Sequence, residues 1–385
     1  MTGWWIGVAA GMLGAIVVAW LVPAWAMRRL LPVLERSGRV VTNYRGREVV
    51  LGLGVVWLVW CVGYAALSAL FGNASGYLQW LFADSAGTSA ELLAIAMRVS
   101  ITGLPTLLVA GAFAFGLLDD MFDSGGSKGF RGHLVALREG TVTTGALKLL
   151  GIGTLALIAG ASAAARVGRL NFTSSISRQP GWSIAVGLGA WLLGALVIAL
   201  AANFVNLTDL RPGRALKTYT LLVLLGVCST AWRLWYTYDD TARFLSAGPG
   251  PTIWVLAGAL LLAVSLLGPV VAVWRYDLGE RAMLGDAGAN AMGALAGYVL
   301  ASSLPLWLLA IVAAVLLALN LASERVSFSR VIEERPLLRW IDGLGRLAAD
   351  RPGEGDAGNL VEKGEGRATT DADVTDTEQG RDGGN

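Results

Sequence analysis

Acidic side chains at the end of an apolar segment are the first residues of this sequence that could do chemistry. Asp119, Asp120 and Asp123 follow such a segment, and Asp119 and Asp123 would share a face of a continuing helix because they lie four residues apart. Adjacent carboxylates repel each other unless a positive charge lies between them. The cluster therefore predicts either a bound divalent cation or the hydrated end of a helix.

Amide and acidic side chains recur at two further segment ends. Asn203, Asn206 and Asp209 are spaced three residues apart and fall on one helical face, although the two amides could instead bond across helices. Asp286 begins a later apolar segment and follows Gly285, whose lack of a side chain allows close backbone approach. Asp286 could cap that helix, bind a cation, or do both.

Basic residues accompany these acids. Lys148 stands at the start of an apolar segment, from which its ammonium could reach back towards the membrane interface. Lys128 lies in the preceding loop with Arg131 and Arg138, and a simple excess of bases in cytoplasmic loops would also explain these three residues. His133 is the single histidine of the chain, so it cannot form a His-based metal site alone.

These residue types fit the joining of a lipid phosphate to a nucleotide diphosphate. Several negative charges converge in that reaction, so carboxylates help only if they hold a divalent cation such as Mg²⁺. The cation and a nearby Lys or Arg would then neutralise the phosphates, which is most of the catalysis in phosphoryl transfer. An ion-coupled transporter would use the same residue types and stays open as an alternative.

The composition is that of a helical membrane protein. Of the 385 residues, 55% are hydrophobic and only 15% are charged, whereas a soluble domain carries about 25% charged residues. Apolar segments near the length of about 18 residues that crosses hydrocarbon as a helix recur before residue 322. Open sheets cannot cross a bilayer, so we expect an all-α polytopic bundle of nine spans. The predicted spans are 4–27, 49–71, 96–118, 145–165, 182–202, 218–236, 252–274, 287–303 and 304–321.

Lys and Arg predict the orientation of these spans. Taken together, the loops that follow every second span contain more bases than the other loops, which assigns them to the cytoplasm, places the N-terminus outside and makes the C-terminus cytoplasmic. These loops are 28–48, 119–148, 203–217 and 275–286. The first span is expected to stay uncleaved, since Arg28, the first base, follows its apolar segment. All the acidic and amide clusters then fall on the cytoplasmic side.

Small residues and cysteines support a packed helical bundle without a disulfide framework. Glycine occurs 50 times, and Gly293-Ala-Leu-Ala-Gly297 has the spacing by which helices pack closely in membranes. Cys61 and Cys228 lie inside apolar segments and show neither a metal-binding nor a disulfide pattern.

The pattern divides the chain into a transmembrane domain over 1–321, a membrane-surface segment over 322–349 and an acidic tail over 350–385. In the second region, apolar residues recur at helical spacing with arginines between them, which predicts a short helix lying on the membrane. These apolar residues are Leu337, Leu338, Ile341, Leu344 and Ala348. The tail has ten acids, four bases and no aromatic residue, so we expect it to be disordered.

Three motifs resemble those of the polyprenyl-phosphate N-acetylhexosamine-1-phosphate transferases, the family that includes phospho-N-acetylmuramoyl-pentapeptide transferase. They are Gly116-Leu-Leu-Asp119-Asp120-Met-Phe-Asp123, Asn203-Phe-Val-Asn206-Leu-Thr-Asp209 and Gly285-Asp286-Ala-Gly288-Ala-Asn290-Ala-Met-Gly293. The similarity covers roughly residues 4–321, and it includes the order of the motifs and their shared cytoplasmic side.

The resemblance implies a Mg²⁺-dependent attack of undecaprenyl phosphate on a UDP-amino-sugar, with release of UMP, at the cytoplasmic face of a bacterial inner membrane. It implies that Asp119 and Asp120 are catalytic, one of them deprotonating or orienting the lipid phosphate, and that Lys148 contacts phosphate. It assigns the metal to Asp286 and Asp120. The residues implied in nucleotide-sugar binding are Asn203, Asn206, Asp209 and Lys128. The product would serve cell-wall or surface-glycan synthesis; a homodimer is compatible with this role, and no nucleic-acid partner is expected.

The chain departs from the family pattern in three ways. Pro212 stands where the family has a second Asp, the early Pro-Thr-x-Gly-Gly segment is not evident, and neither a His-rich loop nor a tenth span follows residue 321. These losses concern nucleotide and sugar recognition more than the metal centre. A homologue that binds polyprenyl phosphate without turnover is therefore a second alternative, beside the transporter.

Overall fold

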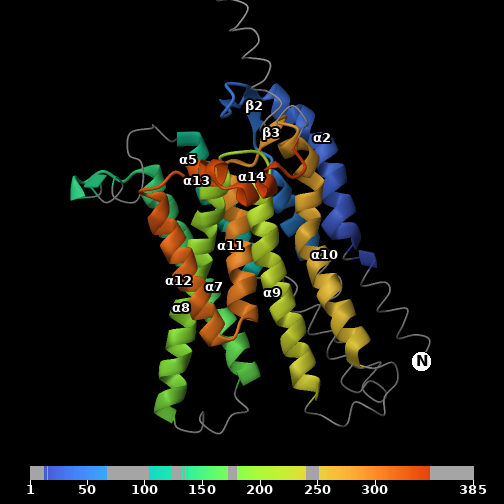
Figure 1. The fold of residues 1–385 in the computed structure, drawn as a ribbon, viewed down its shortest axis with the longest axis vertical. Helices are drawn as coiled ribbons and strands as arrows, with labels where there is room; N and C mark the ends of the chain where they lie inside the picture. The colour runs from blue at the N-terminus through green and yellow to red at the C-terminus, as the bar shows by residue number, and fades with distance from the viewer. Residues whose placement is uncertain are drawn as a thin grey trace, which may run out of the picture.

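Long helices running side by side make up most of the protein (Figure 1). The computed structural model describes residues 13–14, 16–66, 104–122, 132, 135–136, 138–171, 180–239 and 251–346. The helices are η1 Val17–Leu21, α2 Val22–Arg36, α5 Leu104–Phe122, α7 Thr144–Asn171, α8 Pro180–Thr208, α9 Arg214–Asp239, α10 Pro251–Leu278, α11 Gly285–Ser303, α12 Leu306–Ser323, α13 Phe328–Glu334 and α14 Pro336–Gly343. The strands are β1 Val40–Thr42, β2 Glu48–Leu51 and β3 Ala282–Met283. The predicted helical bundle is confirmed, with a small three-stranded sheet added to it.

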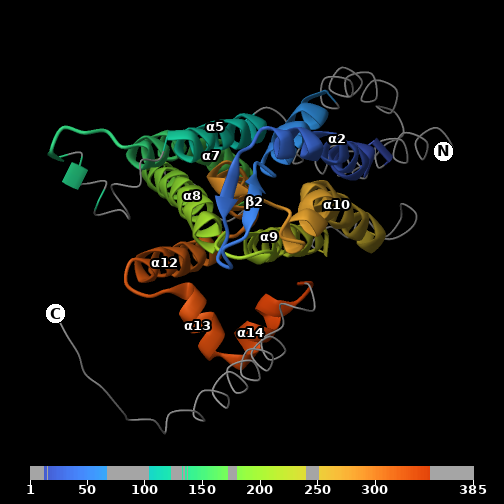
Figure 2. The same ribbon diagram turned by 90° about the horizontal axis from the view of Figure 1, so that it is seen from above.

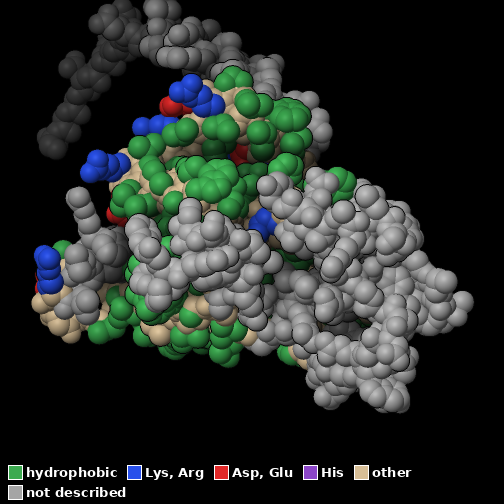
Figure 3. Space-filling model, turned by 90° about the horizontal axis from the view of Figure 1, so that it is seen from below, with side chains coloured by type: hydrophobic (Ala, Val, Ile, Leu, Met, Phe, Trp, Pro, Cys, Tyr) green, Lys and Arg blue, Asp and Glu red, His purple; other side chains and the backbone are tan. Residues whose placement is uncertain are grey.

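Seven of the described helices are long and apolar enough to cross a membrane. They are Val17–Arg36, Leu104–Phe122, Thr144–Ala164, Ile184–Thr208, Arg214–Arg233, Gly258–Leu278 and Leu306–Ser323. Large apolar side chains are exposed along them, including Leu221 at 70% and Trp307 at 67%. Hydrophobic side chains also cover much of the described surface seen from the end opposite the sheet (Figure 3). Exposed apolar surface of this extent is expected where lipid covers a protein.

Two predicted spans take a different form in the structure. Span 287–303 corresponds to α11, which is buried along nearly its whole length because α5, α7, α8 and α9 pack around it. Span 49–71 corresponds to the shorter apolar helix Val55–Ala66, and residues 67–71 lie outside the described residues. The turn expected at Pro305 separates α11 from α12. The total of nine spans remains a prediction.

Small residues let α11 pack closely against α8. A Cβ atom added at Gly293 would lie 2.6 Å from the Ala201 oxygen, and one added at Gly297 would lie 2.6 Å from Ile198 Cα. Both positions therefore require glycine, because the two backbones approach too closely for any side chain. The packing role predicted for these two glycines is confirmed.

The sheet lies at the end of the bundle where α11 begins (Figure 2). β1 and β2 pair in antiparallel fashion, while β2 and β3 pair in parallel fashion with Val50 opposite Ala282. Just after β2, a Cβ atom added at Gly54 would lie 2.5 Å from Gly288 Cα. The sheet and this close backbone contact therefore fix the segment after α2 against the first turn of α11.

Aromatic side chains from two other helices donate hydrogen bonds to backbone carbonyls of α10 near Pro269, which cannot donate one itself. Pro269 has no N–H, so the Ser265 carbonyl one turn earlier lacks its usual helical donor. Trp60 Nε1 donates to that carbonyl at 2.8 Å, and Tyr219 O–H donates to the carbonyl of Leu266 at 2.9 Å. These buried bonds hold α10 against α9 and against the apolar helix that begins at residue 55.

Two short helices follow α12, and the second of them, α14, corresponds to the short helix expected from the apolar residues after position 336. α13 ends at Glu334 and α14 begins at Pro336, because proline inside a helix removes a hydrogen bond and clashes with the preceding turn. Both helices lie at the end of the bundle that carries the sheet (Figure 1). The predicted acidic tail over 350–385 lies outside the described residues.

Candidate functional site

Four carboxylates from three separate parts of the chain meet where α11 begins. Asp119 and Asp120 come from the last turn of α5, Asp209 follows α8 directly, and Asp286 is the second residue of α11. We call these four residues the acid cluster. Lys148, from the first turns of α7, lies among them. The structure therefore brings these five residues together at one end of α11.

The Lys148 ammonium joins two helices by bonding to Asp119 Oδ2 and to Asp286 Oδ2. The side chains of Lys148 and Asp119 are each 12% exposed, and that of Asp286 is 32% exposed. Because water reaches the three groups only partly, their mutual attraction is screened less than at an open surface. A single cation thus holds two carboxylates from helices that are distant in the sequence.

Asp120 caps the N-terminus of α11 from outside that helix. Its Oδ1 accepts a hydrogen bond from the Asp286 N–H at 3.0 Å, and its Oδ2 accepts one from the Ala287 N–H at 2.9 Å. The first N–H groups of a helix have no intrahelical acceptor, and a negative charge is favourable there. The capping role considered for Asp286 therefore belongs to Asp120, whose two oxygens are both engaged by backbone donors.

Asp209 completes this contact with the start of α11. Its Oδ2 accepts a hydrogen bond from the Gly285 N–H at 3.1 Å. Burial raises the pKa of Asp209 well above its usual range, and the negative charges of Asp277 and Asp286 raise this pKa further, against the effect of the Gly285 N–H. These surroundings favour the neutral, protonated form of Asp209 unless a cation lies beside it.

Two glycines of the motifs make this geometry attainable. Gly285 has a φ of 71°, in the left-handed region that other residues adopt only at a cost. A Cβ atom there would lie 2.9 Å from Asp120 Oδ2. A Cβ atom at Gly116 would lie 2.4 Å from the backbone carbonyl oxygen of Asp286, so only glycine lets α5 come this close to α11. These contacts bring Asp120 within reach of the backbone that it caps.

The predicted nucleotide-sugar residues divide between the cluster and its surroundings. Asn203 lies apart from the cluster, because its Nδ2 donates to Asn320 Oδ1 of α12 at 2.6 Å. Asn203 therefore takes the helix-packing role that the sequence had left as an alternative. Asn206 lies one turn before Asp209, and its carbonyl accepts the Asp209 N–H at 3.1 Å. Lys128, like Asp123 and His133, lies outside the described residues.

Two acids near the site were missed from the sequence. Asp277 is only 3% exposed, and its Oδ2 accepts a hydrogen bond from the Gly213 N–H at 2.6 Å, in the loop that follows Asp209. Glu280 has a side chain only 2% exposed and accepts a hydrogen bond from Asn43 Nδ2 at 3.1 Å at the β1–β2 turn. The sequence signal that could have identified Asp277 is an acid at the end of an apolar span.

Cationic side chains border the site at the β1–β2 turn. Arg47 and Arg45 both pair with Glu280, at 3.3 Å and 3.5 Å. The Arg211 guanidinium lies 4.8 Å from the centre of the Tyr44 ring, within the range of a cation–π contact. Segments 40–51, 209–214 and 277–286 are thus held together on the side of the acid cluster that faces away from the bundle interior.

Comparison with known proteins adds no family assignment. No family model and no curated protein matches this chain. The resemblance to phosphosugar transferases therefore rests on the sequence motifs.

The donor set of the acid cluster fits Mg²⁺ better through Asp119 and Asp286 than through Asp120. Asp119 and Asp286 lie close enough to share one ammonium, and Mg²⁺ typically takes one or two carboxylates and completes its shell with water and substrate phosphates. Both oxygens of Asp120 already accept backbone hydrogen bonds. Among the described residues, no group of three or more His, Cys, Asp or Glu forms a complete metal cage.

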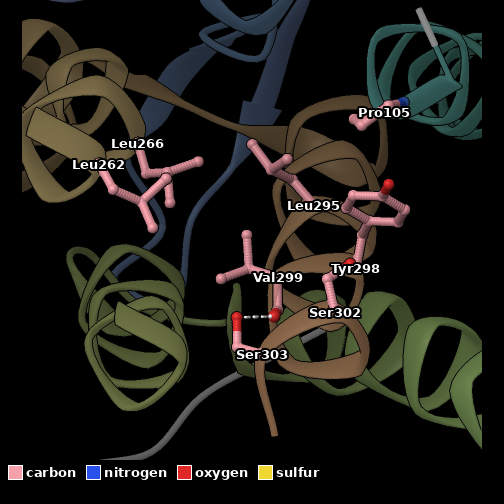
Figure 4. Close-up of a pocket in the computed structure, with 8 residues that line it drawn as sticks. All are labelled: Pro105, Leu262, Leu266, Leu295, Tyr298, Val299, Ser302 and Ser303. Carbon is pink, nitrogen blue, oxygen red and sulfur yellow. Dashed lines mark hydrogen bonds between the residues drawn. The ribbon is translucent and has the colours of Figure 1, made fainter. Parts of the chain in front are cut away.

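A small cavity lies farther along the bundle, away from the acid cluster (Figure 4). Leu262 and Leu266 of α10 face Leu295 and Val299 of α11 across it. Its polar lining includes Ser303, whose Oγ donates to the Val299 carbonyl of the same helix. None of the charged residues of the acid cluster lines this cavity. The groups that could carry chemistry lie at the start of α11.

Proposed function

We propose that the chain transfers a sugar-1-phosphate from a UDP-sugar to polyprenyl phosphate, such as undecaprenyl phosphate, at the cytoplasmic face of a bacterial inner membrane. The observation that carries this proposal is the Lys148 ammonium between Asp119 and Asp286, at the start of a helix capped by Asp120. This arrangement combines carboxylates with a fixed cation at the N-terminus of a helix, as a reaction between two phosphates requires.

The residues divide the work of such a reaction. Asp119 and Asp286 would hold Mg²⁺, which supplies charge neutralisation on the diphosphate when it is bound. Lys148 would hold a phosphate oxygen, and Asp119 would orient the lipid phosphate. A lipid phosphate oxygen forms a bond to the phosphorus that carries the sugar, while the bond from that phosphorus to UMP breaks. Asp120 and Asp209 position the first turn of α11 rather than touching the reacting atoms.

The proposed topology has nine spans, an external N-terminus and a cytoplasmic C-terminus. Seven apolar helices of membrane-spanning length support it, together with the buried helix α11 at their centre. The acid cluster lies where α5 ends and α11 begins, so this orientation would open the site to soluble nucleotides and to lipid head groups.

Binding of polyprenyl phosphate without turnover is the second candidate function. It is favoured by Lys148, whose charge is already shared by two carboxylates, and by Pro212, which replaces an acid of the family motif. Ion-coupled transport is less favoured, because the cluster lies at helix ends, whereas transporter sites lie near the bilayer midplane.

A UMP-release assay tests the proposal. Purified protein with Mg²⁺ and undecaprenyl phosphate is screened against a panel of UDP-sugars, and release of UMP is expected with at least one of them. Asp119→Asn and Asp286→Asn should abolish most of that release, whereas Glu139→Gln, at an exposed turn, should not. Lipid-phosphate binding without UMP release from any sugar would support the second function, and unchanged release in both Asp variants would contradict the proposal.

A further inference from the structure

The helix α14 leaves most of its apolar side chains uncovered. Leu337 is 66% exposed, Trp340 64% and Ile341 40%, and Leu344, which directly follows the helix, is 43% exposed. Positions 337, 340 and 341 have the spacing that places residues on one side of a helix. The helix has only eight residues, and helices shorter than about 12 residues are marginal in water by themselves. A surface that receives these side chains would therefore stabilise it.

The position of α14 indicates what that surface is. Figure 1 shows α13 and α14 at the level where the long helices end. Figure 2, seen from above, shows both lying outside the group of long helices, beyond α9 and α12. The side of these helices that faces away from the bundle therefore meets, in a membrane, the head-group region of the lipid. Trp and other apolar side chains, with Arg nearby, favour this region.

The charges beside these apolar residues favour an anionic surface. Arg330, Arg335 and Arg339 are exposed in α13 and α14. Glu333, an acid of the same segment, is already paired with Arg211 of the loop before α9. Exposed bases near an anionic leaflet are attracted to it.

One buried residue fixes α14 to the bundle. Asp342 is 8% exposed, and its carboxylate accepts hydrogen bonds from Arg214 Nε at 2.7 Å and Nη2 at 2.9 Å, and from Arg346 Nη2 at 3.0 Å. Burial alone would raise the pKa of Asp342, but its hydrogen bond to Arg214 and the charges of Arg346 and Arg214 outweigh burial and lower that pKa. We call Arg214, Asp342 and Arg346 the α14 clamp.

The clamp reaches the loop that carries Asp209. Arg346 Nε donates to the Pro212 carbonyl at 3.2 Å, and Lys217 Nζ donates to the Asp342 carbonyl at 2.6 Å. Gly213, which follows Pro212, donates its backbone N–H to Asp277 Oδ2. The loop between α8 and α9 is therefore fixed to α11 through Asp209, to α10 through Gly213 and to α14 through the clamp.

We propose that α14 is a membrane-surface anchor whose exposed apolar side chains insert into an anionic cytoplasmic leaflet, and that the α14 clamp transmits this attachment to the loop of Asp209. Lipid contact by α14 requires no transferase activity, so its test is separate from that of the proposed function. The effect on the loop rests on the proposed function.

Site-directed fluorescence in lipid nanodiscs tests the anchor. Trp340→Cys, and separately Leu337→Cys, is labelled with a fluorophore in full-length protein that carries Cys228→Ala, since Cys228 is exposed and Cys61 is buried. The nanodiscs contain an anionic phospholipid and a lipid with a quencher on its acyl chain. Arg39→Cys, an exposed position before β1, is the matched control.

The anchor predicts roughly threefold stronger quenching at positions 337 and 340 than at position 39, and a loss of this excess when Arg335 and Arg339 are both changed to Gln. Equal quenching at all three positions would overturn the proposal. Cross-linking between copies through position 340 would assign the surface to a second copy. Quenching that appears only after truncation at residue 349 would assign it to the acidic tail, and both results also overturn the anchor.

Discussion

The acid cluster and the α14 clamp lie at the same end of the bundle, yet they balance charge in opposite ways. In the clamp, the single carboxylate of Asp342 accepts hydrogen bonds from two guanidinium groups of the protein, those of Arg214 and Arg346. In the acid cluster, the described residues supply one ammonium, that of Lys148, for four carboxylates. The first arrangement is complete by itself, whereas the second has negative charge left for a cation or a cationic complex.

This difference suggests that the α14 clamp has a structural role and that the acid cluster has a functional one. A buried charge that is fully paired needs no further partner, and its main effect is to fix the geometry of its neighbours. Carboxylates in excess at the edge of a membrane are costly unless they are used. The contrast predicts that substitutions in the clamp lower stability first and activity second, and that substitutions in the acid cluster do the reverse.

Removal of the ammonium from the acid cluster should have the largest effect. Lys148→Met leaves Asp119 and Asp286 without their shared partner, and the rate of UMP release should fall by about 10²–10³-fold, the usual effect of losing one group that stabilises transition-state charge. The thermal unfolding midpoint should also depend more strongly on Mg²⁺ than in the unchanged protein. Lys148→Arg, which keeps the charge, should retain more activity. Unchanged UMP release in Lys148→Met would remove the lysine from the site.

Removal of a guanidinium from the clamp should mainly reduce stability. Arg214→Ala leaves the buried Asp342 without its bidentate partner, and the free energy of unfolding should fall by about 3 kcal/mol. The exposed Arg330→Ala is the matched control and should change it by less than about 0.5 kcal/mol. Denaturant titration in detergent measures both variants. Equal losses in the two would show that the clamp contributes no more than a surface arginine.

The backbone at the start of α11 offers an effect of intermediate size. Gly285→Ala forces a side chain into a left-handed conformation and towards the Asp120 carboxylate, which should cost about 1–2 kcal/mol of unfolding free energy. Gly187→Ala lies in α8, where an added Cβ atom meets nothing within 4 Å, and should be neutral or slightly stabilising. Thermal unfolding of the two variants side by side separates a local backbone requirement from a general effect of alanine.

The ion pair between α13 and the loop before α9 should matter least. Glu333 has a side chain that is 51% exposed and pairs with Arg211, so Glu333→Gln should change the unfolding free energy by less than about 1 kcal/mol. The small difference should disappear at high ionic strength, because exposed pairs are screened. A loss as large as that of Arg214→Ala would show that α13, rather than the clamp, holds the C-terminal segment.

The long helices could be predicted from the sequence because their signal is local. An apolar segment of sufficient length specifies a span wherever it lies, and seven described helices of that kind are present. The close helix packing at Gly293 and Gly297 also follows from local spacing, whereas their partner helix, α8, comes from the structure. The short helix expected from the spacing of Leu337, Leu338 and Ile341 is present as α14, but it ends at Gly343, before Leu344.

The partners within the site could be predicted only in part, because they come from distant segments. The motifs indicated that Asp119, Asp120, Asp209 and Asp286 converge. They did not indicate that Asp120 caps a helix whose N-terminus lies 166 residues farther along the chain. The bond between Asn203 and Asn320, 117 residues apart, was likewise one of two alternatives that spacing could not separate.

Transfer of labelled phosphate to lipid tests the central claim most directly. A UDP-N-acetylhexosamine carrying ³²P at its sugar-linked phosphate is incubated with undecaprenyl phosphate, Mg²⁺ and the purified protein, and the lipid phase is counted. The proposed function predicts label in the lipid together with an equal amount of UMP, and loss of both in Asp286→Asn. Label that stays in the aqueous phase for every sugar tested, or that enters the lipid equally well with Asp286→Asn, would contradict it.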